Sequence, residues 1–116
     1  MRRGDVWWGA PPLPGGSRKR RPFLVVSLDA FNRNELYPKV MVVHLTTTQR
    51  SGDPFQWEVE VPRGVAGLQA ASTVKCNEVY TLRKAHLETP VGTLPRSYLE
   101  RVDRALGVAL GIGAPR

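Results

Sequence analysis

Cysteine is almost absent from the chain, since Cys76 is the only one among 116 residues. A single thiol cannot form an internal disulfide, and the sequence has no CxxC or Cys/His spacing of the kind that binds zinc. We therefore predict no metal ion and no cofactor. Cys76 itself is expected to be a small buried hydrophobic residue, which is the usual environment of a free cysteine.

Long apolar runs are also missing. No stretch approaches the roughly 20 apolar residues that a membrane-spanning helix needs, and the N-terminus has no signal-peptide core. We expect a cytoplasmic protein with no membrane partner. With 116 residues, 41% of them hydrophobic, the chain can bury one modest core, so residues 1–116 are predicted to form a single domain.

Acidic residues are in the minority, with 10 Asp and Glu against 17 Lys and Arg, which gives a net charge of +7. A small domain this basic favours an anionic partner, and a nucleic acid is the simplest choice. The sequence has no glycine-rich loop before a helix of the kind that holds nucleotide phosphates, so nucleotide hydrolysis is not expected.

Hydrophobic patterning predicts several short strands followed by one helix. Runs rich in β-branched and aromatic residues, or alternating between apolar and polar, indicate strands, and a repeat of three and four indicates a helix. The predicted strands are a short aromatic one that ends residues 3–8 and strands at 23–27, 40–48, 55–61, 72–77 and 79–82. Helical turns are predicted at 29–33 and 83–86, and a helix at 95–110. Short strands joined by Gly/Pro turns predict a mostly β, α+β fold: a small barrel-like antiparallel sheet packed by a terminal helix.

Two details of this pattern can be tested by a structure. In the strand at 55–61, Glu58 and Glu60 alternate with apolar residues and are expected to lie on a solvated face. In the helix, the apolar stripe is expected to run along Leu99, Val102, Leu106 and Ala109.

A run of positive charge leads directly into the first buried strand. Arg18, Lys19 and Arg20 lie on a Gly/Pro-rich loop. Arg21 lies at the start of the strand, where the following Pro22 favours an extended backbone. A guanidinium fixed in this way matches phosphate oxygens bidentately. The alternative is a solvated charge run beside a core strand.

The second buried strand carries polar residues near its end. His44 and Thr46 are two residues apart and project to the same side. If the strands at 23–27 and 40–48 pair antiparallel, Arg21 and Thr46 meet at the same rim of the sheet. His44 titrates near neutral pH and is a candidate for acid–base chemistry, or else a hydrogen-bonded histidine at the core edge. Trp8 is either a platform for a stacked base or a packing residue.

Four blocks of the sequence, taken together, resemble the MazF/PemK family, the mRNA-cleaving toxins of type II toxin–antitoxin systems. They occur in the family's order: Arg3-Gly4-Asp5-Val6-Trp7, Arg21-Pro22-Phe23-Leu24-Val25-Val26-Ser27, Val43-His44-Leu45-Thr46-Thr47 and Cys76-Asn77-Glu78-Val79-Tyr80-Thr81-Leu82. The resemblance implies an SH3-like small barrel of the CcdB/MazF type that forms a homodimer. It also implies a cognate antitoxin peptide as partner.

The activity implied by this resemblance is sequence-specific, metal-independent cleavage of single-stranded RNA. The products are 2′,3′-cyclic phosphate (or 3′-phosphate) and 5′-hydroxyl ends. The family's catalytic arginine and threonine match Arg21 and Thr46, and His44 stands where the family more often has proline or a small residue. The candidates for RNA contact are Arg18, Lys19, Arg20, Thr47, Trp8, Asn77 and Glu78.

Two other functions remain as alternatives. One is a CcdB-like toxin that poisons DNA gyrase by protein contact without cutting nucleic acid. The other is an inactive nucleic-acid-binding barrel. The presence of both Arg21 and Thr46 favours the nuclease, because a gyrase poison does not need that pair.

Overall fold

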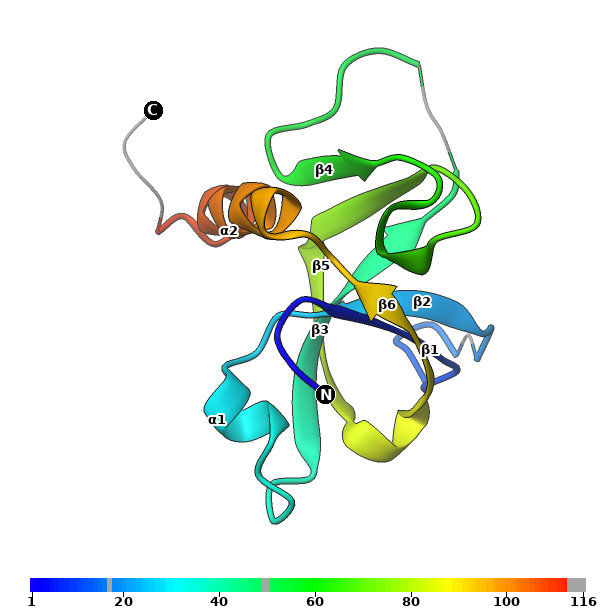
Figure 1. The fold of residues 1–116 in the computed structure, drawn as a ribbon, viewed down its shortest axis with the longest axis vertical. Coiled ribbons are helices and arrows are strands. Elements are labelled where there is room, and N and C mark those ends of the chain that lie inside the picture. The colour runs from blue at the N-terminus through cyan, green and yellow to red at the C-terminus, as the bar shows by residue number, and fades with distance from the viewer. Residues whose placement is uncertain (17, 49–50, 113–116) are drawn as a thin grey trace.

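The computed structural model describes residues 1–16, 18–48 and 51–112, which form one curved antiparallel sheet packed by a helix (Figure 1). The sheet has six strands in the order β4-β5-β3-β2-β1-β6. The elements in chain order are β1 (Asp5–Gly9), β2 (Arg21–Val25), α1 (Asp29–Asn32), β3 (Lys39–Thr46), β4 (Glu58–Val61), η1 (Val65–Gly67), β5 (Ser72–Arg83), η2 (Lys84–His86), β6 (Leu87–Thr93) and α2 (Arg96–Leu110).

The sheet curls until its two edges approach each other. The 3₁₀ turn η1, which follows the edge strand β4, packs against the opposite edge strand β6. The approach is tight enough that a Cβ atom on Gly92 would collide with the carbonyl of Ala66, so glycine is required there. The result is the barrel-like α+β fold that the sequence predicts.

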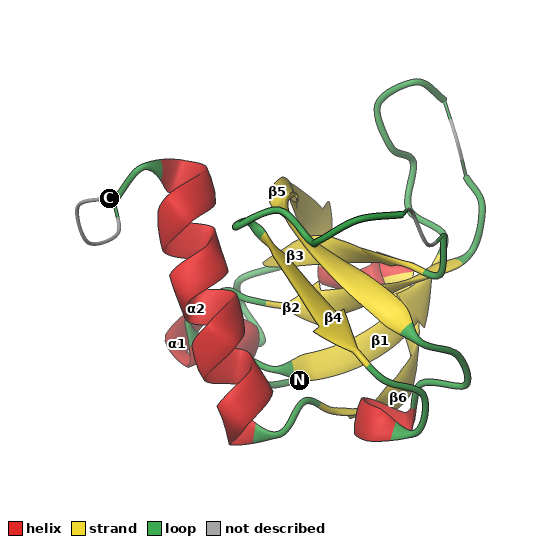
Figure 2. Ribbon diagram, turned by 90° about the horizontal axis from the view of Figure 1, so that it is seen from above, coloured by secondary structure: helices red, strands yellow, loops and turns green. Residues whose placement is uncertain are grey.

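Hydrophobic residues fill both sides of this curled sheet. The larger cluster includes Val6, Leu24, Leu45 and Val74 and is covered by α2, which lies along one side of the sheet (Figure 2). The second cluster is built on other side chains of β2 and β3, with residues from the loop before β2, from β5 and from β6. Both central strands are therefore buried on both faces, as their continuous apolar runs predict.

The helix α2 agrees with the predicted 95–110, but its buried stripe differs at one end. Val102 and Ala105 are buried, Leu99 and Leu106 pack partly against the core, and Ala109 is exposed. The last turn is exposed rather than packed on the sheet, with Leu110 59% accessible. None of the described helices is long and apolar enough to cross a membrane.

The strand predicted at 55–61 begins only at Glu58. Phe55 and Trp57 stack on each other at 4.7 Å in the preceding turn, where the Phe55 carbonyl accepts from the Glu58 amide. Glu58 is buried, so its expected solvated position is wrong, whereas Glu60 is exposed as predicted. The alternation fails at Glu58 because an ion pair to Lys75 compensates its buried charge.

Two further differences involve β5 and β6. The strands expected at 72–77 and 79–82 are one strand, β5, whose pairing with β3 shifts between Val43 and His44 because of a bulge over residues 76–78. No strand was predicted at β6, which contains Pro90 and Gly92. Proline is tolerated there because β6 is an edge strand.

Candidate functional site

The pairing of β2 with β3 brings Arg21 and Thr46 to one rim of the sheet. The strands are antiparallel, with Phe23 opposite His44 and Val25 opposite Val42. The same register carried two residues further places Arg21 opposite Thr46, so their side chains and that of His44 share a face. The register is the one that a meeting of Arg21 and Thr46 requires, and their meeting stays a prediction.

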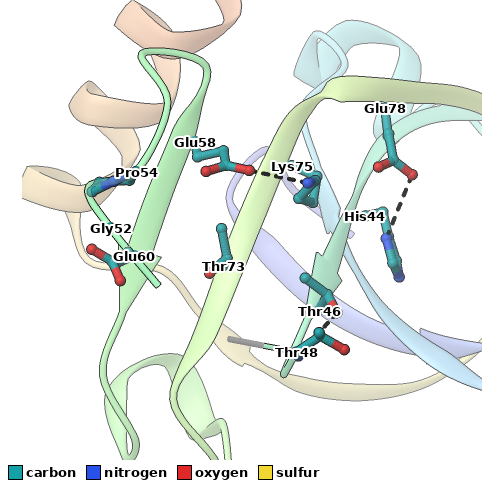
Figure 3. Close-up of a pocket in the computed structure, with 10 residues that line it drawn as sticks. All are labelled: His44, Thr46, Thr48, Gly52, Pro54, Glu58, Glu60, Thr73, Lys75 and Glu78. Carbon is teal, nitrogen blue, oxygen red and sulfur yellow. Dashed lines mark hydrogen bonds and ion pairs between the residues drawn. The ribbon is translucent and has the colours of Figure 1, made fainter. Parts of the chain in front are cut away.

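The hydroxyl of Thr46 has a defined orientation. Its Oγ1 accepts a hydrogen bond from the Thr48 amide at 3.1 Å, as Figure 3 shows. Since a hydroxyl can accept and donate at the same time, this contact leaves the hydroxyl proton able to point at a bound oxygen.

His44 lies between Arg21 and the middle of β5. Its Nε2 is 3.4 Å from Nη1 of Arg21, and its Nδ1 is 3.8 Å from Oε1 of Glu78. The hydroxyl of Tyr80 donates to that same Glu78 oxygen at 3.2 Å. The His44 side chain is only 15% exposed, so these neighbours control its chemistry.

The environment of His44 lowers its pKa below the ordinary value of 6.5. Burial is the largest cause, because it penalises the charged imidazolium, and the positive charges of Arg21 and Lys75 act in the same direction. The negative charge of Glu78 raises the pKa and partly opposes them. His44 is therefore neutral at pH 7 and able to accept a proton.

A hollow of about 240 Å³ opens beside these residues, between β3, β4 and β5 (Figure 3). Besides His44, Thr46 and Glu78, its lining contains Lys75 and the buried Glu58, whose Nζ and Oε2 form an ion pair at 3.0 Å. The remaining lining residues are Thr48, Gly52, Pro54, Glu60 and Thr73. A small concave site with converging polar groups is the usual form of a ligand-binding site.

Sequence reasoning missed Lys75 and Glu58 as residues of this hollow. The structure brings them in through the ladder, where His44 is opposite Lys75 and Lys75 is opposite Glu58. The signal available in the sequence was that Glu58 alternates with apolar residues along its strand. That signal could not show that a strand more than ten residues later would place a lysine beside it.

Most of the predicted RNA contacts do not line this hollow. Arg20 lies 5.4 Å over the Trp8 ring and contacts Glu88 and Thr89 of β6. Because Trp7 packs with the cluster that contains Phe23, the neighbouring Trp8 points to the opposite face of β1. The cationic run is thus divided: Arg21 faces His44, and Arg20 faces Trp8.

The remaining candidates are spread around the site. Arg18 and Lys19 are exposed on the loop before β2, Thr47 is exposed just after β3, and Asn77 is exposed in the β5 bulge. Glu78, in the same bulge, lines the hollow. Their contact with RNA remains a prediction.

Cys76 is buried, as expected for a free cysteine. Burial, with a smaller effect from Asp103, raises the pKa of its thiol to about 12, so it is protonated and not a nucleophile. In the part of the chain that the structure describes, no three His, Cys, Asp or Glu side chains are grouped as a metal site would require.

Comparison with known proteins shows the family of the chain. The model of the family described as PemK-like, MazF-like toxin of type II toxin-antitoxin system matches residues 2–110. The chain belongs to this family. Among curated relatives of this PemK/MazF chain, Endoribonuclease MazF6 of Mycobacterium tuberculosis is 32% identical over 106 residues, covering 90% of this chain and 91% of the relative. A probable endoribonuclease MazF of Mycolicibacterium smegmatis is 33% identical over 112 residues, covering 97% and 98%.

Solved structures of PemK/MazF toxins share the fold. A mycobacterial endoribonuclease in complex with its cognate antitoxin superposes with a TM-score of 0.79 at 27% identity, covering 99% of both chains. The toxin MazF-mt6 of Mycobacterium tuberculosis has a TM-score of 0.73 at 26% identity, covering 93% of this chain and 99% of that one. These matches confirm the fold and the family that the sequence blocks indicate.

Proposed function

We propose that this chain is an endoribonuclease toxin that cuts single-stranded RNA at preferred sequences without a metal ion. The cut leaves 2′,3′-cyclic phosphate (or 3′-phosphate) and 5′-hydroxyl ends. The observation that carries the proposal is that Arg21 contacts His44, and that His44 and Thr46 line the hollow from the same face of β3. The curated relatives named as endoribonucleases support the same activity.

The reaction starts at the ribose 2′-hydroxyl, which attacks the adjacent phosphorus once its proton is removed. Neutral His44 is the base in this proposal, because its lowered pKa leaves Nε2 able to accept a proton at pH 7. Arginine is a poor base, since its pKa above about 12 keeps it protonated.

Arg21 and Thr46 act on the phosphate. The phosphorane formed by the attack carries two negative charges, which Arg21 compensates with its charge and its N–H donors. Thr46 donates its hydroxyl to a phosphate oxygen and fixes the position of the group. In-line displacement places the 5′-oxygen on the side of phosphorus away from the 2′-oxygen, so in this proposal its proton comes from solvent rather than from His44. Arg21 stays protonated and donates hydrogen bonds to the phosphate.

The partners follow from the family and the charge. One solved relative is held in complex with its cognate antitoxin. We extend this to an antitoxin peptide with acidic residues that covers the basic surface of this chain, whose net charge is +7. In the proposal the toxin acts as a homodimer in the cytoplasm, with RNA contacts supplied by the cationic residues before β2.

The test is to incubate the purified protein with a long single-stranded RNA in the presence of EDTA and to map the new ends. Fragments that begin with a 5′-hydroxyl and share a sequence at the cut support the proposal. Intact RNA together with stalled DNA gyrase would instead establish the CcdB-like function. Intact RNA that is only bound would establish an inactive binding barrel.

A further inference from the structure

The contacts of His44 determine which of its ring nitrogens carries the proton. Nη1 of Arg21 faces Nε2 at 3.4 Å, and a guanidinium has donors but no acceptor. This contact favours Nε2 as the acceptor, which puts the proton of the neutral ring on Nδ1. That N–H points toward Oε1 of Glu78, 3.8 Å away.

The Glu78 carboxylate is itself held in place. The hydroxyl of Tyr80 donates to Oε1 at 3.2 Å. Burial is the largest cause that raises the pKa of this phenol, and the adjacent carboxylate raises it further, so the phenol stays a donor. Glu78 remains 38% exposed, so its carboxylate has room to shorten the 3.8 Å separation from Nδ1, as catalytic hydrogen bonds often do when substrate binds.

A bulge in β5 makes this meeting possible. Val43 is opposite Val79 and His44 is opposite Lys75, so residues 76–78 are extra in the ladder. Bulges redirect a side chain that regular pairing would have placed elsewhere, and they are frequent beside active sites. Here the bulge places Glu78 next to His44 while Lys75 remains its cross-strand neighbour.

We propose that Glu78 is a positioning residue that holds the Nδ1–H of His44 and so aims Nε2 at the ribose 2′-hydroxyl. This inference rests on the proposed function, in which His44 is the base. Neither the family match nor the sequence blocks assign such a role to a carboxylate at this place.

The charge of Glu78 matters during the proton transfer. When RNA binds, Arg21 turns its N–H from Nε2 to a phosphate oxygen, which frees the Nε2 lone pair. The 2′-hydroxyl proton then moves to Nε2, its oxygen forms the new bond to phosphorus as the bond to the 5′-oxygen breaks, and His44 becomes an imidazolium with a proton on each nitrogen. The charged groups that face the ring are Arg21 on β2 and Lys75 and Glu78 on β5, with Tyr80 behind Glu78; Glu58 on β4 is paired to Lys75. The negative charge of Glu78 stabilises the positive charge that forms on His44, whereas the positive charges of Arg21 and Lys75 destabilise it.

Nuclear magnetic resonance can test the contact without any cleavage assay. The chain has only two histidines, His44 and His86. In a spectrum of protein labelled with ¹⁵N-histidine, the signals of His44 report the contact and those of His86 serve as an internal reference. In the wild-type protein we expect His44 in the Nδ1–H tautomer. In Glu78→Gln we expect a lower His44 pKa, because a raising charge is removed, with His86 unchanged.

Glu100→Gln serves as the matched control. Glu100 lies on α2 in an exposed ion pair with Arg96, so the same chemical change there leaves both histidine titrations at their wild-type positions. An Nε2–H tautomer for wild-type His44, or a His44 titration identical in Glu78→Gln and wild type, would overturn the inference even if the protein cuts RNA.

Kinetics then separate a positioning role from a structural one. A positioned base accelerates a reaction roughly 100- to 10,000-fold, and we expect Glu78→Gln to cut RNA about 10-fold more slowly than wild type. The acid limb of its pH–rate profile should move to lower pH. In a His44→Ala background the same change should have no further effect, because Glu78 acts only through His44. Equal losses in both backgrounds would refute that route, whereas absence of cleavage by the wild type would refute the proposed function instead.

Discussion

Replacing Arg21 by alanine is the most direct test of the proposed chemistry. Arg21 begins β2 and is half-buried, and its guanidinium contacts His44, which lines the hollow. If it compensates charge on the phosphorane, its loss removes one preorganised donor and one positive charge. The removal of a single such donor costs about 3 kcal/mol in the transition state, so we expect kcat to fall roughly 100- to 1,000-fold.

The same substitution has a second effect that serves as an internal check. Arg21 lowers the pKa of His44, so removing its charge lets that pKa rise toward the ordinary value. A base must be deprotonated to act, so the acid limb of the pH–rate profile should move to higher pH in Arg21→Ala. Glu78→Gln is predicted to move the limb in the opposite direction.

Single-turnover cleavage of an end-labelled RNA at a series of pH values measures both effects. Arg83→Ala is the matched control, since Arg83 is exposed at the far end of β5, opposite Lys39 and away from the hollow. If Arg21→Ala cuts RNA as fast as Arg83→Ala, with an unmoved acid limb, then Arg21 neither contacts the reacting phosphate nor influences His44.

Three other predictions concern residues around the hollow. His44→Ala should slow cleavage about 100-fold or more and remove the acid limb, which a pH–rate profile measures; an unchanged profile would assign the base elsewhere. Lys75→Met leaves the Glu58 carboxylate buried without its cation and should cost about 3 kcal/mol, seen as a Tm lower by roughly 10 °C in thermal unfolding, most of it restored by adding Glu58→Gln. A Tm equal to that of the wild type would show that water or other protein contacts stabilise the Glu58 carboxylate without Lys75. Because burial raises the pKa of the Cys76 thiol to about 12, iodoacetamide should modify it only in denaturant; rapid labelling of the folded protein would contradict its burial.

The fold follows from local patterns over most of its length. Apolar runs around Phe23–Ser27 and Val40–Thr48 indicate strands buried on both faces, and the structure buries them between two hydrophobic clusters. Strand β6 was missed because Pro90 and Gly92 resemble a loop, and only its edge position in the sheet allows them. Glu58 was misplaced because alternation shows which side chains share a face, not whether that face is covered.

Sequence alone determined the chemistry available at the rim. The sequence puts Arg21 directly before a proline and Thr46 two residues beyond His44, and simple antiparallel pairing of the two strands predicts that these side chains share one face. Tertiary structure decided which groups act on that chemistry. Lys75 is opposite His44 only because β5 pairs with β3, and Glu78 lies beside His44 only because of the bulge in β5, some thirty residues further along the chain. Tertiary structure also placed Arg20 over Trp8, on the opposite face from Arg21, because successive side chains along an extended segment point to alternate faces. Pairing between distant segments depends on the packing of the whole sheet, which no local pattern encodes.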